Sequence, residues 1–243
     1  MKNKIKKIHF IGIGGSGMSG IAEVMHNLGF NISGSDSASS KVTRELKQMG
    51  IKISFKHDAR NVNNADVIVI SSAISKRNIE LKAGQKKNIP IIPRAEMLSE
   101  LMRFKKGIAV AGTHGKTSTT SILASILSEG KLDPTFVIGG RINSMKANAK
   151  LGTGDLFVVE ADESDASFLH LNPVSTILTN IDREHLETYQ GDFERLKATY
   201  LDFIHQVPFY NNVFLCIDDE EVRNLIPSIL RPIVTYGVLE KAQ

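Results

Sequence analysis

The chain has 243 residues, of which 42% are hydrophobic, so it can bury one large core or two smaller ones. Its net charge of +4 is spread along the chain and aromatic residues make up only 6%, which argues against a nucleic-acid partner because such binders concentrate charge and stacking surface. A membrane span is not expected, since no run of about 18 apolar residues occurs, and the single cysteine, Cys216, favours a reducing compartment, the cytoplasm.

Short apolar runs alternate with amphipathic segments along the chain, which is typical of βαβ units around a parallel sheet. In the first part we expect strands at 8–11, 31–33, 67–70 and 89–92 and helices at 18–27 and 96–103. In the second part we expect strands at 108–111, 156–160, 176–179, 213–217 and 232–235 and helices at 117–127 and 193–205. The polar, glycine-containing stretch 143–154 is expected to be a mobile loop. The prediction is an α/β protein with a domain boundary near residue 105.

A first glycine loop follows the first predicted strand and precedes the first predicted helix. Gly12, Gly14 and Gly17 form a G-x-G-x-x-G pattern, which lets the backbone and the helix N-terminus approach a diphosphate. Asp36 ends the next strand, where a dinucleotide enzyme would hold a ribose hydroxyl. Nicotinamide, flavin and nucleotide-sugar proteins all use this pattern, so the ligand stays open. The candidate binding residues in this loop are Gly14, Gly15, Ser16, Gly17, Met18 and Ser19.

A second glycine loop follows the strand predicted at 108–111. It resembles a shortened Walker A loop, with Lys116 placed for the β and γ phosphates of ATP and Thr117 for magnesium. Val110 occupies the position of the first Walker A glycine, which argues against an ordinary NTPase. The candidate ATP-binding residues here are Gly112, Thr113, His114, Gly115, Lys116, Thr117 and Ser118.

Candidate metal ligands follow the next two strands. Glu160 ends the apolar run 156–159, so its carboxylate is expected at the carboxyl edge of the sheet, where it could hold Mg²⁺. His185 follows the strand at 176–179 together with Asn180, and both are expected to face the same crevice. The acidic residues that follow Glu160 (Asp162, Glu163 and Asp165) are interpreted as a solvated loop.

With these motifs in hand, the chain resembles the Mur ligases of peptidoglycan synthesis over essentially its whole length. The resemblance is carried by HFIGIGGSGMSGIAE at 9–23, GSD at 34–36, SSAI at 71–74, PRAEMLSELMR at 93–103, AGTHGKTSTT at 111–120, VVEADESDASFL at 158–169 and TNIDREHLETY at 179–189. It implies a Rossmann-like domain over 1–105 that binds the UDP part of a sugar substrate, with further contacts from His57, Ser71, Ser72 and Arg94. It also implies a P-loop-type α/β ATPase domain over 106–243.

In that second domain, the resemblance implies that Lys116 holds the γ-phosphate, that Thr117 and Glu160 hold one Mg²⁺ and that His185 holds a second. Lys197 falls where relatives carry a carbamylated lysine. The implied reaction joins L-alanine to UDP-N-acetylmuramate through an acyl phosphate. Because these ligases have a third, amino-acid-binding domain, we expect the chain to be a fragment with impaired or absent catalysis. The alternatives are a ligase that recycles a murein peptide, a nicotinamide oxidoreductase and a non-catalytic nucleotide-binding regulator.

Overall fold

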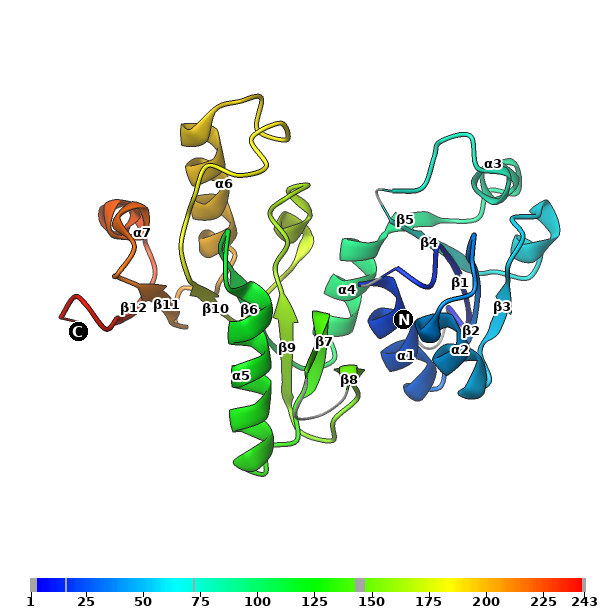
Figure 1. Ribbon diagram of the computed structural model, residues 1–243, viewed down its shortest axis with the longest axis horizontal. Helices are drawn as coiled ribbons and strands as arrows, with labels where there is room; N and C mark the ends of the chain where they lie inside the picture. The colour runs from blue at the N-terminus through cyan, green and yellow to red at the C-terminus, as the bar shows by residue number, and fades with distance from the viewer. Residues whose placement is uncertain (1–3, 16, 72, 143–146, 242–243) are drawn as a thin grey trace. The chain divides into compact units, whose positions relative to one another are not determined.

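The computed structural model describes residues 4–15, 17–71, 73–142 and 147–241, and these form two compact units (Figure 1). The first unit comprises Met1–Leu98 with Asn148–Leu151, and the second comprises Ser99–Ala147 with Gly152–Gln243. The division after Leu98 falls inside a helix, so the boundary predicted near residue 105 stays a prediction. None of the helices in the described part of the chain has the length and apolar character needed to span a bilayer.

The N-terminal unit contains a five-stranded sheet with the strand order β3-β2-β1-β4-β5. All four pairings in this sheet are parallel. Its strands are β1 (Lys7–Ile11), β2 (Asn31–Ser35), β3 (Lys52–Ser54), β4 (Val67–Ile70) and β5 (Ile91–Pro93). Its helices are α1 (Met18–Asn27), α2 (Lys41–Gln48), the 3-10 helix η1 (Ala59–Val62), α3 (Ile79–Lys86) and α4 (Arg94–Met102), which continues past the division. Because parallel strands end at one edge, the loops after β1, β2 and β3 lie next to one another.

The predicted helix at 18–27 and the predicted strand at 67–70 are confirmed with the same bounds. Helices α2 and α3 were missed, because each is short and only two or three of its residues are apolar at helical spacing. Helix α2 is instead fixed by its first turn, where Ser40 Oγ accepts from Thr43 N at 3.1 Å and Thr43 Oγ1 accepts from Ser40 N at 2.8 Å. This reciprocal cap satisfies two amides that the helix leaves open.

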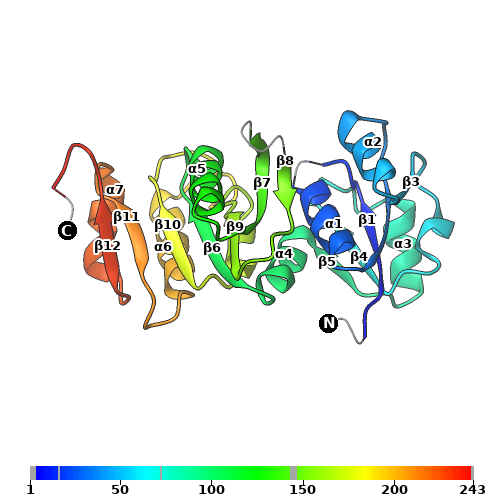
Figure 2. The same cartoon turned by 90° about the horizontal axis from the view of Figure 1, so that it is seen from below.

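A second sheet has seven strands in the order β12-β11-β10-β6-β9-β7-β8. Its strands belong to the second unit, except that most of β8 falls in the stretch Asn148–Leu151, which is counted with the first. Figure 2 shows α5 and α6 on opposite faces of this sheet. The strands are β6 (Lys106–Ala111), β7 (Thr135–Ile142), β8 (Ala147–Lys150), β9 (Leu156–Glu160), β10 (Ser175–Leu178), β11 (Val213–Cys216) and β12 (Ile233–Tyr236). The helices are α5 (Lys116–Glu129), η2 (Ser167–His170), α6 (Phe193–His205), α7 (Glu220–Leu225) and η3 (Ile226–Ser228). In this sheet β6 pairs in parallel with β9 and with β10, and the pairings β10–β11, β11–β12 and β7–β9 are also parallel. Together the two sheets confirm the predicted α/β fold class.

The prediction of a mobile loop at 143–154 is wrong for residues 147–150, which form strand β8, while 143–146 lie outside the described residues. The strand has the sequence Ala-Asn-Ala-Lys, and small and polar residues give none of the β-branched signal by which strands are recognised. Ala149 is nevertheless buried. Further along the same stretch, Lys105 Nζ donates to the Gly152 carbonyl at 2.6 Å, so residue 152 is also held in place.

An aromatic cluster fills the core of the second unit on the side of α6. Phe168 stacks on Phe203 with 4.8 Å between ring centroids and meets Tyr200 edge-on at 5.4 Å. We expect Phe168→Leu to lower the free energy of unfolding by about 1 to 2 kcal/mol, because the variant keeps most of the volume but loses both ring contacts. Urea denaturation would measure the loss. The matched control is Phe209→Leu, which changes an exposed ring and should cost much less. Equal losses of stability in the two variants would contradict the conclusion that the ring contacts of Phe168 stabilise the core.

Candidate functional site

The loop between β6 and α5 contains the second glycine motif. Gly115 caps α5 with a φ of 79°, a left-handed conformation that side-chain-bearing residues adopt only with strain, so the sequence needs glycine there. The helix begins at Lys116, one residue before the predicted start. Thr117 and Ser118 are exposed on its first turn. The positive end of the helix and its open amides therefore face outward beside Lys116, which is an arrangement that favours an anion.

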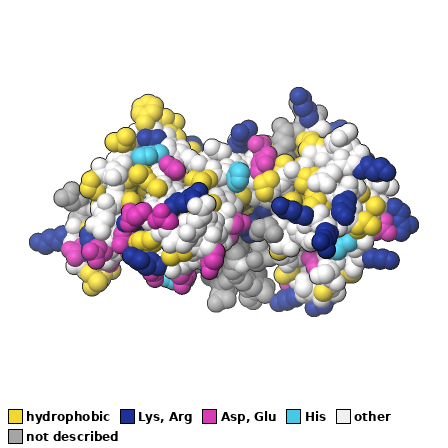
Figure 3. Space-filling model, turned by 90° about the horizontal axis from the view of Figure 1, so that it is seen from above, with side chains coloured by type: hydrophobic (Ala, Val, Ile, Leu, Met, Phe, Trp, Pro, Cys, Tyr) yellow, Lys and Arg dark blue, Asp and Glu magenta, His cyan; other side chains and the backbone are white. Residues whose placement is uncertain are grey.

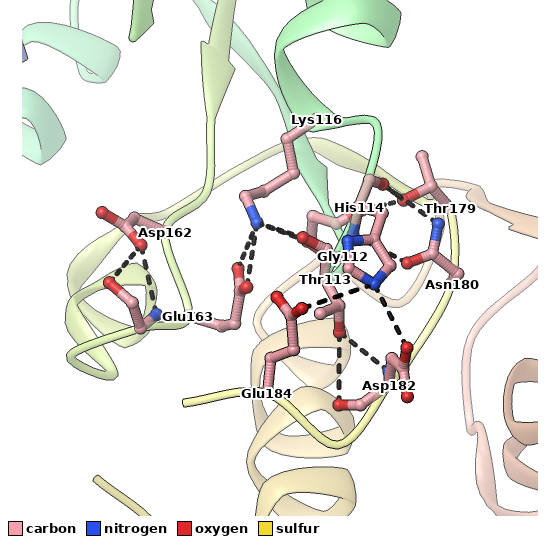
Figure 4. Close-up of polar contacts among 12 residues, drawn as sticks. Gly112, Thr113, His114, Lys116, Asp162, Glu163, Thr179, Asn180, Asp182 and Glu184 are labelled. Atoms are coloured by element: carbon pink, nitrogen blue, oxygen red, sulfur yellow. Dashed lines mark hydrogen bonds and ion pairs between the residues drawn. The ribbon is translucent and has the colours of Figure 1, made fainter. Parts of the chain in front are cut away.

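The Lys116 ammonium is held by the loop itself and by a buried carboxylate (Figure 4). Its Nζ donates to the Gly112 carbonyl at 2.6 Å and lies 2.8 Å from Glu163 Oε2. Burial raises the pKa of Glu163, and the charge of Lys116 opposes that rise. Glu163 is 1% exposed, so the interpretation of this residue as part of a solvated loop is wrong. Its ion pair with Lys116 gives the lysine a fixed position.

Glu160 lies at the end of β9, as predicted, and contacts the first turn of α5. Burial raises its pKa, whereas hydrogen bonds from the Thr117 hydroxyl and the Gly139 amide, together with the charge of Lys116, lower it. Among the described residues Glu160 Oε1 is buried without a hydrogen-bond partner. A Cβ at Gly139 would lie only 2.8 Å from Glu160 Oε2, so the glycine permits this approach. Sequence reasoning missed Gly139, because nothing in its neighbourhood marks it as part of a site.

The segment after β10 closes against the second glycine loop from its other side (Figure 4). Asn180 Oδ1 accepts from the His114 amide at 2.8 Å, and Asn180 Nδ2 donates to the His114 carbonyl at 3.0 Å. The Asp182 amide donates to Thr113 Oγ1 at 2.8 Å, and His114 Nε2 lies 3.2 Å from Asp182 Oδ2. Asn180 therefore lies at the loop, where sequence reasoning placed it, and its side chain holds the loop backbone.

His185 and Lys197 lie apart from these contacts. His185 is exposed and has a left-handed φ of 54°. Lys197 Nζ lies 2.6 Å from Glu194 and 3.2 Å from Glu221, and hydrogen bonds to these carboxylates raise its pKa. Those ion pairs stabilise the ammonium form of Lys197, whereas carbamylation requires the neutral amine. The described residues contain no cluster of three or more acidic, histidine or cysteine side chains suited to a metal.

The first glycine loop lies at the carboxyl end of β1 and is tied to the end of β2. The amides of Gly12 and Ile13 donate to the Ser35 carbonyl at 2.8 and 3.0 Å. The Gly14 amide donates to Asp36 Oδ2 at 2.8 Å, so Asp36 holds the loop in this structure. Gly15 is exposed, whereas the side chains of Met18 and Ser19 are buried in α1, and Ser16 lies outside the described residues.

The remaining predicted substrate residues surround that loop within the N-terminal unit. The Arg94 side chain, at the start of α4, lies against Gly17, because a Cβ added at Gly17 would collide with it. His57 follows β3, and its ring nitrogen Nδ1 lies 3.1 Å from Glu80 Oε2. Ser71 follows β4 and is half-buried, and Ser72 lies outside the described residues. Sequence reasoning missed Glu80, since a lone glutamate in the first turn of a helix is an ordinary feature.

The class of protein is therefore an α/β protein with two glycine loops, each of which follows a strand of a parallel sheet. A lysine, a hydroxyl and a carboxylate are grouped at the second loop. The family model "Mur ligase family, catalytic domain" matches residues 7–106, and "Mur ligase middle domain" matches residues 110–243. The chain belongs to the Mur ligase family.

Curated relatives match along the whole chain. UDP-N-acetylmuramate–L-alanine ligases from Janthinobacterium sp. (strain Marseille) and Neisseria gonorrhoeae (strain ATCC 700825 / FA 1090) are 58% and 55% identical, over 100% of this chain and 52% of each relative. The chain therefore spans about half the length of these relatives. The solved UDP-N-acetylmuramate-alanine ligase from Thermotoga maritima is similar with a TM-score of 0.85 and 32% identity, over 97% of this chain and 53% of that one.

A solved ligase that is named for a different substrate has a similar fold. It is the UDP-N-acetylmuramate:L-alanyl-gamma-D-glutamyl-meso-diaminopimelate ligase from Neisseria meningitides, with a TM-score of 0.87 and 28% identity. The match covers 95% of this chain and 78% of that chain. Both solved ligases therefore share the fold of this chain, although one is named for an amino-acid substrate and the other for a peptide substrate.

Proposed function

We propose that the chain forms the nucleotide-sugar-binding and ATP-binding parts of a ligase that joins L-alanine to UDP-N-acetylmuramate. The observation that carries the proposal is the grouping of Lys116, Thr117 and Glu160 at the N-terminus of α5. The curated relatives named for this reaction support the choice of substrates. We place the nucleotide-sugar domain at 1–105, the ATP-binding domain at 106–243 and the protein in the cytoplasm, where ATP is available.

The triphosphate of ATP would bind at the loop before α5. Lys116 would exchange its ion pair with Glu163 for the γ-phosphate, and the amides at the start of α5 would donate to phosphate oxygens. Gly112, Thr113, His114, Gly115 and Ser118 form the rest of this cradle. Asn180 would act by holding the His114 backbone in place.

Mg²⁺ fits the oxygen ligands beside that cradle. Thr117 and Glu160 would hold the ion, and the buried, unpartnered Glu160 Oε1 is the donor that such an ion would satisfy. The metal would neutralise charge on the phosphates. We propose His185 as the ligand of a second ion.

The N-terminal unit would bind the UDP part of the sugar substrate. Most of the charged side chains on the face of this unit seen in Figure 3 are lysine or arginine, which suits an anionic ligand. We assign the diphosphate to the loop after β1 and to Arg94, which lies beside it. Asp36, His57, Ser71 and Ser72 complete the proposed substrate set, with Asp36 acting through the Gly14 amide.

The proposed reaction has two steps. A carboxylate oxygen of the muramate attacks the γ-phosphorus of ATP and forms an acyl phosphate with release of ADP. The amine of alanine then attacks the acyl carbon, and phosphate leaves as the amide bond forms. Lys116 would stabilise the negative charge that develops on the transferred phosphoryl group.

Replacing Thr117 with valine tests the proposed metal site. We expect Thr117→Val to weaken Mg²⁺-dependent ATP binding about tenfold, because the variant keeps the shape of the side chain but removes one hydroxyl ligand. Titration calorimetry with and without Mg²⁺ measures the effect. The matched control is Thr119→Val, which makes the same change at a half-buried position outside the cradle. A Thr117→Val variant with unchanged metal dependence would remove Thr117 from the site.

The proposed function is tested by measuring ADP release. Binding of each nucleotide is measured on this chain, and ADP release is measured on the longest natural form of the protein, mixed with ATP, Mg²⁺ and UDP-N-acetylmuramate and with either L-alanine or the tripeptide L-alanyl-γ-D-glutamyl-meso-diaminopimelate. We expect this chain to bind both nucleotides and the longest natural form to release ADP when alanine is present. Release with the tripeptide alone would favour the alternative of a murein-peptide ligase, because the similar Neisseria meningitides structure is named for a ligase of that tripeptide. Binding of NADH without binding of ATP would overturn the proposal.

A further inference from the structure

A buried carboxylate in the N-terminal unit is not used by the proposed reaction. Glu80, on α3, has no exposed surface, yet polar side chains from three other segments converge on it. Ser35 Oγ donates to Glu80 Oε2 at 2.5 Å, His57 Nδ1 lies 3.1 Å from the same oxygen, and Asn61 Nδ2 donates to Oε1. A buried charge is costly unless it is well partnered, so such a cluster needs a reason to exist.

The hydrogens in this cluster can be assigned. Burial alone would raise the pKa of Glu80, but hydrogen bonds from Ser35, Asn61 and His57, together with His9 Nε2 at 3.8 Å, outweigh it and hold the pKa at about 2. At neutral pH the carboxylate is therefore ionised and can only accept hydrogen bonds. The single hydroxyl hydrogen of Ser35 is donated to it.

The His57 ring must then supply the hydrogen for its own contacts. His57 Nδ1 lies 3.1 Å from Glu80 Oε2 and 3.2 Å from Ser35 Oγ, and both of these oxygens act as acceptors towards it. Nδ1 therefore carries a hydrogen. In a neutral imidazole only one nitrogen does so, which leaves Nε2 as a hydrogen-bond acceptor.

We propose that Glu80 is a positioning residue that fixes His57 as the Nδ1–H tautomer, so that Nε2 accepts a hydrogen bond from the bound nucleotide. The His57 side chain is 30% exposed and its Nδ1 edge faces the buried carboxylate, so we place Nε2 on the exposed side of the ring. This inference rests on the proposed function, in which the unit binds a uridine nucleotide. The ligand must offer an N–H or O–H donor at this point.

Two groups of a uridine nucleotide have that chemistry. The base has an imide N–H at its N3 position, whereas cytosine has an acceptor there, and the ribose has hydroxyl groups. A hydrogen bond to His57 Nε2 would therefore discriminate between bases if the donor is the imide N–H. It would discriminate between ribose and deoxyribose if the donor is a hydroxyl.

The same carboxylate also supports the first glycine loop. The Ser35 side chain is bound to Glu80, and the Ser35 carbonyl accepts the amides of Gly12 and Ile13. Glu80 thus fixes, through one residue, the end of β2 on which the loop is held. The first glycine loop and His57 therefore both depend on α3, although no side chain of α3 is among the residues proposed to bind the substrate.

The first experiment needs no variant. In the nitrogen-15 spectrum of the wild-type chain, with histidine labelled and the His57 signals assigned by their absence from His57→Phe, we expect the neutral ring to carry its hydrogen on Nδ1, both alone and with UDP. A ring that carries its hydrogen on Nε2 in either state would overturn the inference.

The second experiment compares UDP with N3-methyl-UDP and 2′-deoxy-UDP. In the wild type, one of the two analogues should bind on the order of tenfold more weakly than UDP, because a hydrogen bond is lost. That difference should disappear in His57→Phe, whose ring cannot accept the bond. It should shrink in Glu80→Gln, where the amide can turn either group towards His57. An analogue difference of the same size in all three proteins would contradict the inference. If UDP did not bind the wild type at all, the proposed function itself would fail.

Discussion

Replacing Lys116 with alanine is expected to weaken ATP binding roughly a hundredfold, because a charge-assisted hydrogen bond to phosphate contributes about 1.5 to 3 kcal/mol and no other lysine lies in the loop. Lys116 lies 2.8 Å from Glu163 Oε2, so its side chain is held near the proposed position of the phosphates. Titration calorimetry on the wild type and the variant measures the change.

Removing Lys116 also leaves Glu163 without its ion-pair partner, and a loss of folding has to be separated from a loss of binding. Thermal unfolding of the variant measures the loss of folding. The matched control for net charge is Lys106→Ala, which removes an exposed lysine at the opposite end of the same strand and should leave ATP affinity unchanged. If Lys116→Ala bound ATP as tightly as Lys106→Ala, the second glycine loop would not be the triphosphate site.

The parts of the fold that could be predicted are those encoded by local patterns. The strand at 67–70 is a run of four apolar β-branched residues, and the helix at 193–205 has apolar residues at helical spacing behind Asp192, whose side chain caps it. The glycine loops are equally local, since each glycine acts within a few residues of its own position. These signals place the carboxyl ends of the strands, and with them the positions of Lys116 and Glu160.

The rest of the candidate site depends on contacts between distant segments. Glu163 reads as one acid in a charged run, and only folding shows that it is buried against a lysine 47 positions earlier. Gly139 approaches Glu160 because β7 pairs with β9, a pairing that no local pattern predicts. Asp36 lies where a dinucleotide enzyme would hold a ribose hydroxyl, and the sequence does not show that its carboxylate accepts a hydrogen bond from the Gly14 amide. In each case the sequence shows the chemistry of the residue, but only the folded structure shows which residue it contacts.

Glu80 should make the stability of the N-terminal unit depend on acid pH. Its folded-state pKa is lowered from 4.5 to about 2, so its contribution is complete above pH 4.5 and is lost as the pH falls towards 2. A shift of that size corresponds to about 3 kcal/mol. We therefore expect Glu80→Gln to lower the free energy of unfolding by up to about 3 kcal/mol at pH 7 and to differ little from the wild type near pH 2.

Urea denaturation followed by circular dichroism at pH 7, 5 and 3 would measure both curves. Other carboxylates titrate in the same range, but their contributions are shared by the two proteins, so the difference isolates Glu80. The control is Glu45→Gln, at an exposed position where the stability difference should stay small at every pH. A difference between Glu80→Gln and the wild type that stayed constant from pH 7 to pH 3 would mean that the charge of Glu80 is not what stabilises the cluster.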